Sequence, residues 1–252
     1  HAGQIAYEGY SQTFYLDVLE TVPAFSYIPQ LFRMEGDYLT YDDGTVQGHL
    51  GVDVSQFQGE IDWDAVADDN IDFAMVRVGF RGTGTGSLNT DKYYEQNIRG
   101  AMRAGLETGV YFFAQAVTVE EAIEEADYVI SLLDGLDING PVAYDWEMHD
   151  STYRVYGTSP EMATACAVAF CERIKDAGYT PMVYGGTYVT YMKYDQGALA
   201  DYLSWYPEYK SEKSEKLCPT LVYHMDYWQF SSSRAVAGIN GRVDMNIQFI
   251  RR

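Results

Sequence analysis

From residue 48 onward, short apolar runs alternate with longer stretches of helical periodicity. The apolar runs predict β-strands at residues 48–54, 72–79, 108–114, 141–147 and 180–185. The stretches between them predict helices at residues 62–69, 91–104, 119–134 and 160–177. Strands that alternate with helices in this way are typical of βαβ units and of a parallel sheet.

The helix boundaries carry the expected capping residues. Thr118 is followed three residues later by Glu121, which predicts a capping box at the start of a helix. The pair Ser159-Pro160 predicts the start of the next helix, and Gly178 predicts its end.

After the fifth strand the predicted strands lie closer together, near residues 202–205, 220–229 and 242–248. The last connection, residues 231–242, is too short and polar for a useful helix. Five strand–helix units followed by three strands give eight strands, and eight strands close naturally into a barrel. We therefore predict an α/β protein with a single TIM-like barrel at residues 48–252.

Residues 1–47 differ from the rest of the chain. They are polar and rich in tyrosine, with weak periodicity and a turn-like segment at residues 41–44. We expect an irregular N-terminal extension or linker. The chain begins at His1 without a methionine or a signal peptide, so we also expect a processed or trimmed form of a longer chain.

Composition narrows the possible partners. The chain of 252 residues carries 17 Lys and Arg against 37 Asp and Glu, a formal net charge of −20. This charge argues against nucleic acid and anionic membranes as partners, and no apolar run reaches the roughly 18 residues that a membrane span needs. Cys166, Cys171 and Cys218 form no paired Cys/His spacing, so we expect buried thiols rather than a disulfide framework or a zinc site.

The segment at residues 141–149 (PVAYDWEMH) is the most informative for chemistry. Asp145 and Glu147 are two residues apart, so on a strand they point to the same face. They end the fourth predicted strand, where barrel enzymes carry their catalytic groups. Neighbouring carboxyl groups push each other's pKa values apart, which prepares one as an acid for glycosidic cleavage. Two solvated acids at a strand end would give the same pattern, so both interpretations stay open.

Asp53 and Asp244 lie on the first and last predicted strands, which are neighbours in a closed barrel, so they could meet at its mouth. Together with the 145/147 pair and His149, these acids could also hold a hard cation. No clustered run of ligands supports that alternative, and we expect no metal.

Three weaker patterns have plainer interpretations. Residues 82–86 (GTGTG) resemble a phosphate loop but lack its GKS or GKT ending, which favours a surface loop. No GxSxG motif supports a serine hydrolase. The acidic run at residues 120–125 is expected to be a solvated helix face.

Together these segments resemble glycoside hydrolase family 25, the Chalaropsis-type lysozymes or N-acetylmuramidases, from about Leu50 to Phe249. The matching segments occur in the family's order: residues 51–59 (GVDVSQFQG), 61–63 (IDW), 73–82 (FAMVRVGFRG), 109–113 (GVYFF), 141–147 (PVAYDWE), 228–232 (WQFSS) and 238–246 (GINGRVDMN). Any one segment is weak, but the ordered set is specific.

The resemblance implies a (β/α)5(β)3 barrel and a set of site residues. It assigns the proton donor to Glu147, assisted by Asp145, which would orient the 2-acetamido group of the substrate or stabilise the cation. Asp53 and Asp244 match two accessory acids. Substrate-binding positions are expected at Arg77, Tyr111, Phe113, Tyr184, Trp205, Tyr209 and Gln229.

The implied activity is that of a secreted or cell-surface muramidase without a cofactor. It would act as a monomer on peptidoglycan glycan strands and cleave the β-1,4 bond between N-acetylmuramic acid and N-acetylglucosamine. The alternatives are a catalytically silent glycan-binding barrel and a related retaining hydrolase of chitin-like glycans; the presence of both Asp145 and Glu147 favours an enzyme. Pro207 stands where the family usually has a small residue, residues 1–47 lie outside the resemblance, and we expect wall targeting to need a further segment.

Overall fold

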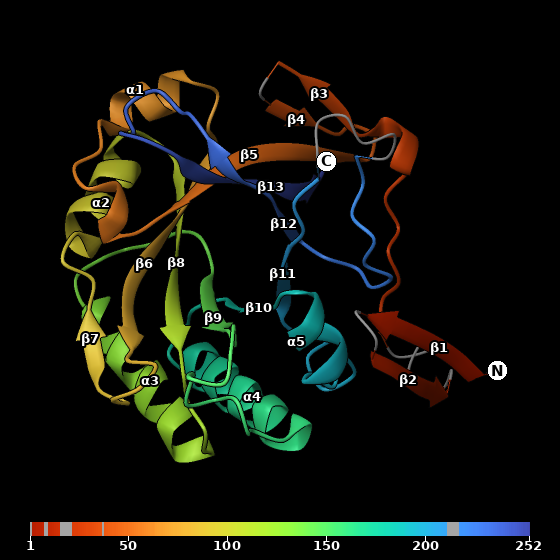
Figure 1. The fold of residues 1–252 in the computed structure, drawn as a ribbon. Helices are drawn as coiled ribbons and strands as arrows, with labels where there is room; N and C mark the ends of the chain where they lie inside the picture. Colours follow the sequence, from red (N-terminus) through yellow and green to blue (C-terminus); the bar gives the residue numbers. More distant parts are fainter. Residues whose placement is uncertain (1, 8–9, 16–21, 37, 211–216) are drawn as a thin grey trace.

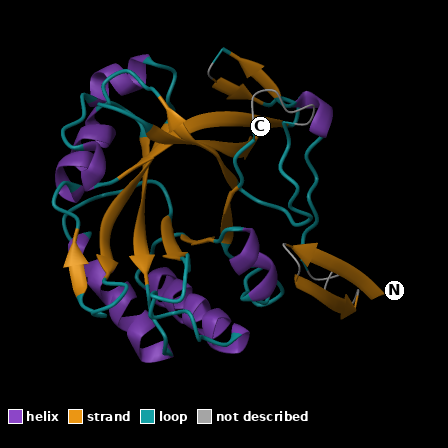
Figure 2. Ribbon diagram, in the orientation of Figure 1, coloured by secondary structure: helices purple, strands orange, loops and turns teal. Residues whose placement is uncertain are grey.

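The computed structural model describes residues 2–7, 10–15, 22–36, 38–210 and 217–252. Within them, eight strands close into a barrel with helices on its outside (Figures 1 and 2). The barrel strands are β5 (Val46–Val54), β6 (Phe73–Arg81), β8 (Glu107–Ala114), β9 (Val142–Trp146), β10 (Pro181–Tyr184), β11 (Leu203–Pro207), β12 (Tyr227–Arg234) and β13 (Val243–Arg251). The predicted α/β barrel is confirmed.

Strand direction decides which residues meet at the mouth of the barrel. Neighbouring strands from β5 through β12 run parallel, and the pairing of β5 with β6 completes the ring. Strand β13 runs antiparallel to both β12 and β5. Its first residues therefore lie beside the last residues of β5, and Asp244 is the register partner of Asp53.

The helices follow the first five barrel strands and leave the last three without a covering helix (Figure 2). Thr118 Oγ1 accepts a hydrogen bond from the Glu121 N–H at 3.3 Å, and Ser159 caps the next helix in the same way. Gly178 has φ +90°, the left-handed conformation expected just after a helix. The helices are α1 (Trp63–Asp68), α2 (Tyr94–Arg103), α3 (Val119–Leu132), α4 (Pro160–Asp176) and α5 (Thr187–Met192).

The acidic run on α3 is only partly the solvated face that its pattern suggests. Glu125 is fully buried, and its Oε1 accepts hydrogen bonds from Arg81 Nε at 2.7 Å and from the Gln115 N–H at 3.0 Å. Arg81 also donates to Glu124 Oε2 at 2.7 Å. Burial raises the pKa of Glu125 to about 7. The prediction holds for Glu120 and Glu124, which are exposed, and fails for Glu125, because its partner Arg81 comes from strand β6, far away in sequence.

The glycine-rich segment at residues 82–86 is a turn that leads into the short strand β7 (Leu88–Thr90). Arg81 donates through Nη1 to the Gly86 carbonyl at 2.8 Å, and the Arg154 N–H donates to the Thr83 carbonyl at 2.9 Å. The positive charge of Arg81 is already paired with Glu124 and Glu125 of α3, so it is not available to bind a phosphate group. The surface-loop interpretation therefore fits the contacts.

One predicted strand is wrong over most of its length. Residues 220–226 were expected to begin the strand at 220–229, but β12 starts only at Tyr227. Their backbone bonds instead with the chain before the barrel: the Phe25 N–H donates to the Val222 carbonyl at 2.9 Å, and the His224 N–H donates to the Pro23 carbonyl at 2.7 Å. This partner segment lies about 200 residues away in sequence, so local pattern could not identify it.

Within the predicted N-terminal extension, residues 1, 8–9, 16–21 and 37 lie outside the described part of the chain. The described backbone contains two hairpins, formed by β1 (Ala2–Tyr7) with β2 (Tyr10–Tyr15) and by β3 (Arg33–Glu35) with β4 (Tyr38–Thr40), and a short 3-10 helix, η2 (Pro29–Leu31). Tyr27 packs against the barrel, its ring stacked 4.0 Å from that of Phe249. The division into an extension at 1–47 and a barrel domain at 48–252 stays a prediction.

Two hydrophobic cores are separated by the barrel wall. The larger lies between the strands and the helices and contains Cys166 and Cys171; these and Cys218 are buried, free thiols, as predicted. The smaller fills the barrel interior around Phe73 and Met75. A Cβ on Gly51 would lie 2.4 Å from the Phe73 ring, so only glycine allows this ring to close the barrel floor. The interior of the barrel is therefore filled with side chains at this end.

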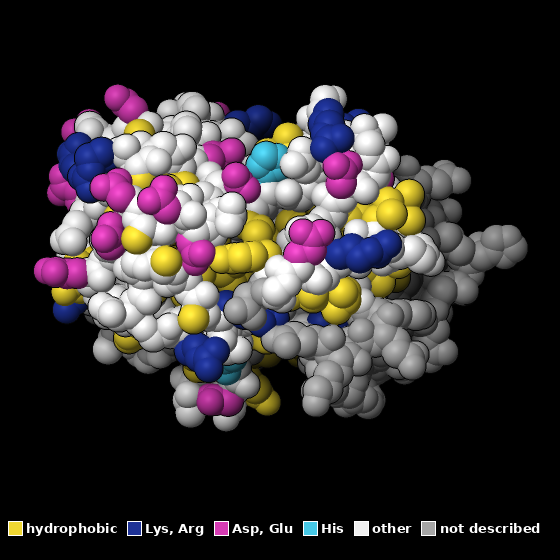
Figure 3. Space-filling model, turned by 90° about the horizontal axis from the view of Figure 1, so that it is seen from above, with side chains coloured by type: hydrophobic (Ala, Val, Ile, Leu, Met, Phe, Trp, Pro, Cys, Tyr) yellow, Lys and Arg dark blue, Asp and Glu magenta, His cyan; other side chains and the backbone are white. Residues whose placement is uncertain are grey.

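Asp and Glu side chains are scattered over the face shown in Figure 3, especially on the side of α1 and α2. This distribution agrees with the net charge of −20. Among the described residues, no helix is both long and apolar enough to cross a membrane.

Candidate active site

A cavity of about 560 Å³ opens at the end of the barrel where the parallel strands finish. Alternate residues of each strand point inward, so the positions two residues beyond the apolar floor supply its lining. Every site residue predicted from the sequence lines this one cavity: Asp53, Arg77, Tyr111, Phe113, Asp145, Glu147, Tyr184, Trp205, Tyr209, Gln229 and Asp244.

Asp145 and Glu147 form a contacting pair of carboxyl groups at the end of β9. Asp145 is buried, whereas the side chain of Glu147 is 24% exposed, and a side-chain hydrogen bond joins them. Burial, followed by the charge of Glu147, raises the pKa of Asp145 well above its usual range. A hydrogen bond between two carboxyl groups requires a proton, so the pair holds one and burial favours its place on Asp145.

His149 is the second partner of Glu147. Its Nε2 lies 2.7 Å from Glu147 Oε2, and its own side chain is 62% exposed. The hydrogen bond to Glu147 raises the pKa of His149. The sequence suggested His149 only as a possible metal ligand, in phase with Glu147. The structure shows it instead as an ion-pairing and hydrogen-bonding partner of Glu147 when the imidazole is protonated.

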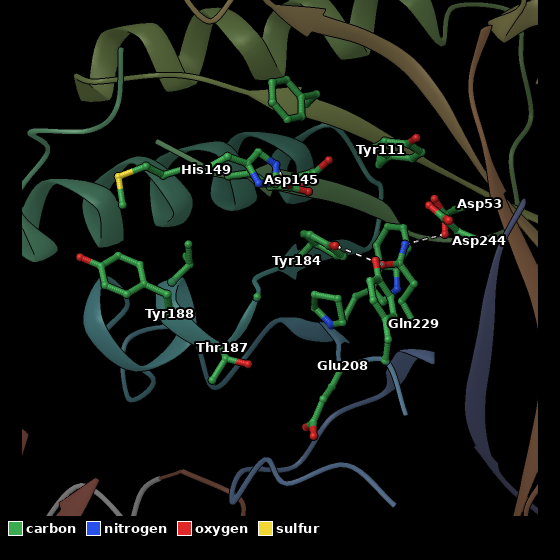
Figure 4. A pocket seen from close by; sticks show the side chains of 18 of the residues that line it. Asp53, Tyr111, Asp145, His149, Tyr184, Thr187, Tyr188, Glu208, Gln229 and Asp244 are labelled. Carbon is green, nitrogen blue, oxygen red and sulfur yellow. Dashed lines mark hydrogen bonds and ion pairs between the residues drawn. The ribbon is translucent and has the colours of Figure 1, made fainter. Parts of the chain in front are cut away.

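Asp53 and Asp244 form a second carboxyl pair on the opposite side of the cavity (Figure 4). Asp53 Oδ2 accepts hydrogen bonds from Gln229 Nε2 and from Asn246 Nδ2, both at 2.8 Å. Burial raises the pKa of Asp53 to about 6, and burial together with the charge of Asp53 raises the pKa of Asp244 to about 8. This pair therefore also binds a proton at neutral pH.

Gln229 connects the second carboxyl pair to the tyrosines of the cavity wall (Figure 4). Its Oε1 accepts hydrogen bonds from the Tyr209 hydroxyl at 2.7 Å and from the Tyr184 hydroxyl at 3.2 Å. With the oxygen so occupied, the amide nitrogen is directed to Asp53. One buried glutamine thus fixes the positions of three side chains.

Trp205 supplies an aromatic surface between these groups. Its Nε1 donates to Asn246 Oδ1 at 2.8 Å, which satisfies the buried indole. The edges of neighbouring rings pack against it, with centroids 4.8 Å away for Tyr184 and 5.9 Å away for Tyr111. The aromatic lining is therefore held rigidly.

Part of the lining was not predicted. Helix α5 contributes Thr187, Tyr188 and Val189, and Glu208 closes the rim after β11. Glu208 accepts a hydrogen bond from the Thr220 N–H at 2.7 Å and pairs with Lys210. The six residues of α5, TYVTYM, are mostly aromatic or β-branched, and such residues favour strands over helices.

Arg77 is a basic group in the lining, on the side of β6. Its Nε and Nη2 lie 3.0 and 2.9 Å from Asp91 Oδ2, and Asp91 is fully buried. Arg77 is therefore held by a compensating charge. The described residues contain no group of three or more His, Cys, Asp or Glu arranged to hold a metal ion, so the acids of this cavity do not form a ready-made metal site.

The arrangement has a clear chemical capacity. One carboxyl pair holds a proton beside an open cavity, and the other presents buried acids across from it. Such a cavity can deliver a proton to one side of a ligand and stabilise positive charge that develops within it.

Several known proteins are similar to this chain. The family model described as glycosyl hydrolases family 25 matches residues 52–239. The autolytic lysozyme of Clostridium acetobutylicum is 25% identical over 197 residues, which cover 78% of this chain but only 54% of that protein. Lysozyme M1 of Streptomyces globisporus is 26% identical over 215 residues, covering 83% of this chain and 71% of that protein.

A solved structure is similar as well. The bacterial lysozyme from Streptomyces coelicolor superposes with a TM-score of 0.62 at 25% identity, covering 81% of this chain and 92% of that one.

Proposed function

The chain belongs to glycosyl hydrolase family 25, and we propose that it is a muramidase that hydrolyses the β-1,4 bond between N-acetylmuramic acid and N-acetylglucosamine in peptidoglycan. The observation that carries the proposal is the Asp145–Glu147 pair, which holds a proton at the open end of the barrel. The lysozymes that match this chain support the same activity.

Glu147 is the proton donor in this proposal. It is the more exposed member of the pair and the one that can reach the glycosidic oxygen of a bound glycan. The shared proton passes to it from Asp145 along their hydrogen bond. General-acid catalysis then protonates the leaving oxygen as the bond to the anomeric carbon breaks.

Asp145 has a second task once it has lost the proton. Its carboxylate lies beside the reacting centre and stabilises the positive charge that develops there, directly or by fixing the 2-acetamido group of the sugar. Burial makes that charge–charge interaction stronger than it would be in water. A buried acid that ionises only as the proton leaves is suited to this role.

The remaining cavity residues hold the glycan. Asp53 and Asp244 act as accessory acids whose charge opposes loss of the proton from the Asp145–Glu147 pair. Sugar rings pack on the aromatic wall and bond to its polar atoms, through Arg77, Tyr111, Phe113, Tyr184, Trp205, Tyr209 and Gln229.

The proposal includes where and how the protein works. Its substrate is an extracellular polymer, so we place its action outside the cell or at the cell surface, as a monomer. Carboxyl groups alone carry glycosidic hydrolysis, so the reaction needs no metal or cofactor.

Replacement of Glu147 tests the proposal. Glu147→Gln keeps the shape of the side chain but removes the transferable proton, and turnover of purified peptidoglycan should fall by roughly 10²- to 10⁴-fold. Glu120→Gln, an exposed position on α3, is the matched control and should behave as wild type. Near-wild-type turnover by Glu147→Gln would overturn the assignment.

A further inference from the structure

Phe57 is an unusually exposed aromatic residue close to the cavity. The residue is 78% exposed, more than any other large hydrophobic residue in the described part of the chain. It lies in the 3-10 helix η3 (Gln56–Gln58), four residues after Asp53. A single exposed apolar residue is common on protein surfaces. Exposure alone therefore does not indicate a binding surface, and the contacts that hold Phe57 in place have to be considered.

The backbone that presents Phe57 is fixed by side chains. Ser55 Oγ accepts a hydrogen bond from the Phe57 N–H at 3.3 Å, and Gln58 Oε1 accepts one from the Ser55 N–H at 2.9 Å. Asp91 Oδ2 accepts a further bond from the Gln56 N–H at 2.9 Å. A ring presented by so constrained a turn loses little conformational freedom when a ligand covers it.

Arg77 connects this ring to the cavity. Its guanidinium lies 5.1 Å from the centroid of the Phe57 ring and also forms part of the cavity lining. Asp91 Oδ2 holds both Arg77 and the turn that carries Phe57. The ring, the guanidinium and the cavity wall thus form one fixed unit.

The position of this unit extends the cavity in a defined direction. Phe57 follows β5, whereas α5, which forms another wall, follows β10 on the opposite side of the ring of strands (Figure 1). A linear ligand that enters past α5 and crosses the two carboxyl pairs leaves the cavity on the side of β5 and β6. The exposed ring of Phe57, which packs on Arg77 of the lining, lies on that side.

We propose that Phe57, backed by Arg77, forms an additional subsite that stacks on a pyranose ring of the same glycan strand, beyond the sugars held in the cavity. The inference rests on the proposed function, because it takes the glycan as the ligand. The C–H-rich face of an N-acetylhexosamine matches the negative face of an aromatic ring, and its polar edge stays in water. The subsite therefore favours long strands over short ones.

The test compares peptide-free glycan strands of four and eight sugars. In the longer strand a sugar would cover one face of the Phe57 ring. We therefore expect Phe57→Ala to lower the ratio of kcat/KM for the longer strand to kcat/KM for the shorter strand by about tenfold. Phe57→Trp should keep the ratio. Ile123→Ala, which removes an exposed apolar side chain on α3 that does not line the cavity, should leave the ratio unchanged.

Two outcomes for Phe57→Ala would overturn the proposed subsite. A Phe57→Ala protein with the wild-type length ratio would show that no sugar covers the ring. If it instead melts early and loses activity equally on both strands, Phe57 merely stabilises Arg77. Failure of the proposed function looks different, because wild type would then cleave neither strand. In that case the dissociation constants of the two glycans would test the subsite. If the affinity for the longer strand relative to the shorter one were the same in wild type and in Phe57→Ala, the inference would be overturned.

Discussion

Asp53 and Asp244 are register partners on antiparallel strands, and their carboxyl groups share a hydrogen bond inside the barrel mouth. Their pKa values are raised to about 6 and about 8, whereas an unfolded chain titrates aspartate near 4. The folded protein therefore binds more protons than the unfolded chain as the pH rises from about 4 to about 8. Over that range this pair lowers the free energy of unfolding.

Asp244→Asn should relieve this destabilisation. We expect its melting temperature to exceed that of wild type at pH 8, and the difference to shrink as the pH falls below about 4, where aspartate becomes protonated in the unfolded chain as well as in the folded one. Thermal melts across that range measure the difference, with Asp68→Asn on the exposed side of α1 as control. A variant less stable than wild type at pH 8 would contradict the shared-proton interpretation.

Asp145→Asn separates the two members of the catalytic pair. Asparagine can donate to Glu147 as protonated Asp145 does, so the fold and the melting temperature should be preserved. It cannot ionise, so kcat should fall by about 10²-fold or more while KM changes little. An Asp145→Asn enzyme that keeps most of its kcat would remove Asp145 from the mechanism.

His149→Gln should shift the pH–rate profile. Its hydrogen bond to Glu147, together with the charge of Asp150, raises the pKa of His149, so the imidazolium persists to higher pH than usual. A cation beside the Asp145–Glu147 pair favours loss of the proton from that pair. Without it the pair keeps its proton longer, and the alkaline limb of kcat/KM should move to higher pH. His49→Gln, beside Asp72, is the control; a shift to lower pH would contradict the argument.

Metal removal should leave the activity intact. The acids of the cavity are engaged with each other and with amide donors rather than arranged around an empty centre. Dialysis against EDTA followed by a turnover assay measures this directly. Lost activity that a divalent ion restores would favour a metal role for the acidic cluster.

Much of this architecture is predictable from sequence because each signal is local. The barrel strands follow from short apolar runs, and the shared inward direction of Asp145 and Glu147 follows from a two-residue spacing. The meeting of Asp53 and Asp244 needs only barrel closure. The roles of these residues stay predictions until variants are measured.

Other features depend on partners far away in sequence. The acidic run on α3 suggested solvated glutamates, but Arg81 from β6 draws Glu125 into the core. Residues 220–226 have strand-like composition, yet they bond with residues 22–25 instead of extending β12. Helix α5 consists mostly of aromatic and β-branched residues, which do not favour a helix, so the cavity wall that it forms was not predicted.

The most direct test of the account identifies the bond that is cut. Soluble fragments released from purified peptidoglycan are reduced with borohydride, and their new ends are identified by mass spectrometry. We predict ends that derive from N-acetylmuramic acid, produced by wild type and almost absent with Glu147→Gln. Ends that derive from N-acetylglucosamine, or equal release by both proteins, would contradict a muramidase that acts through Glu147.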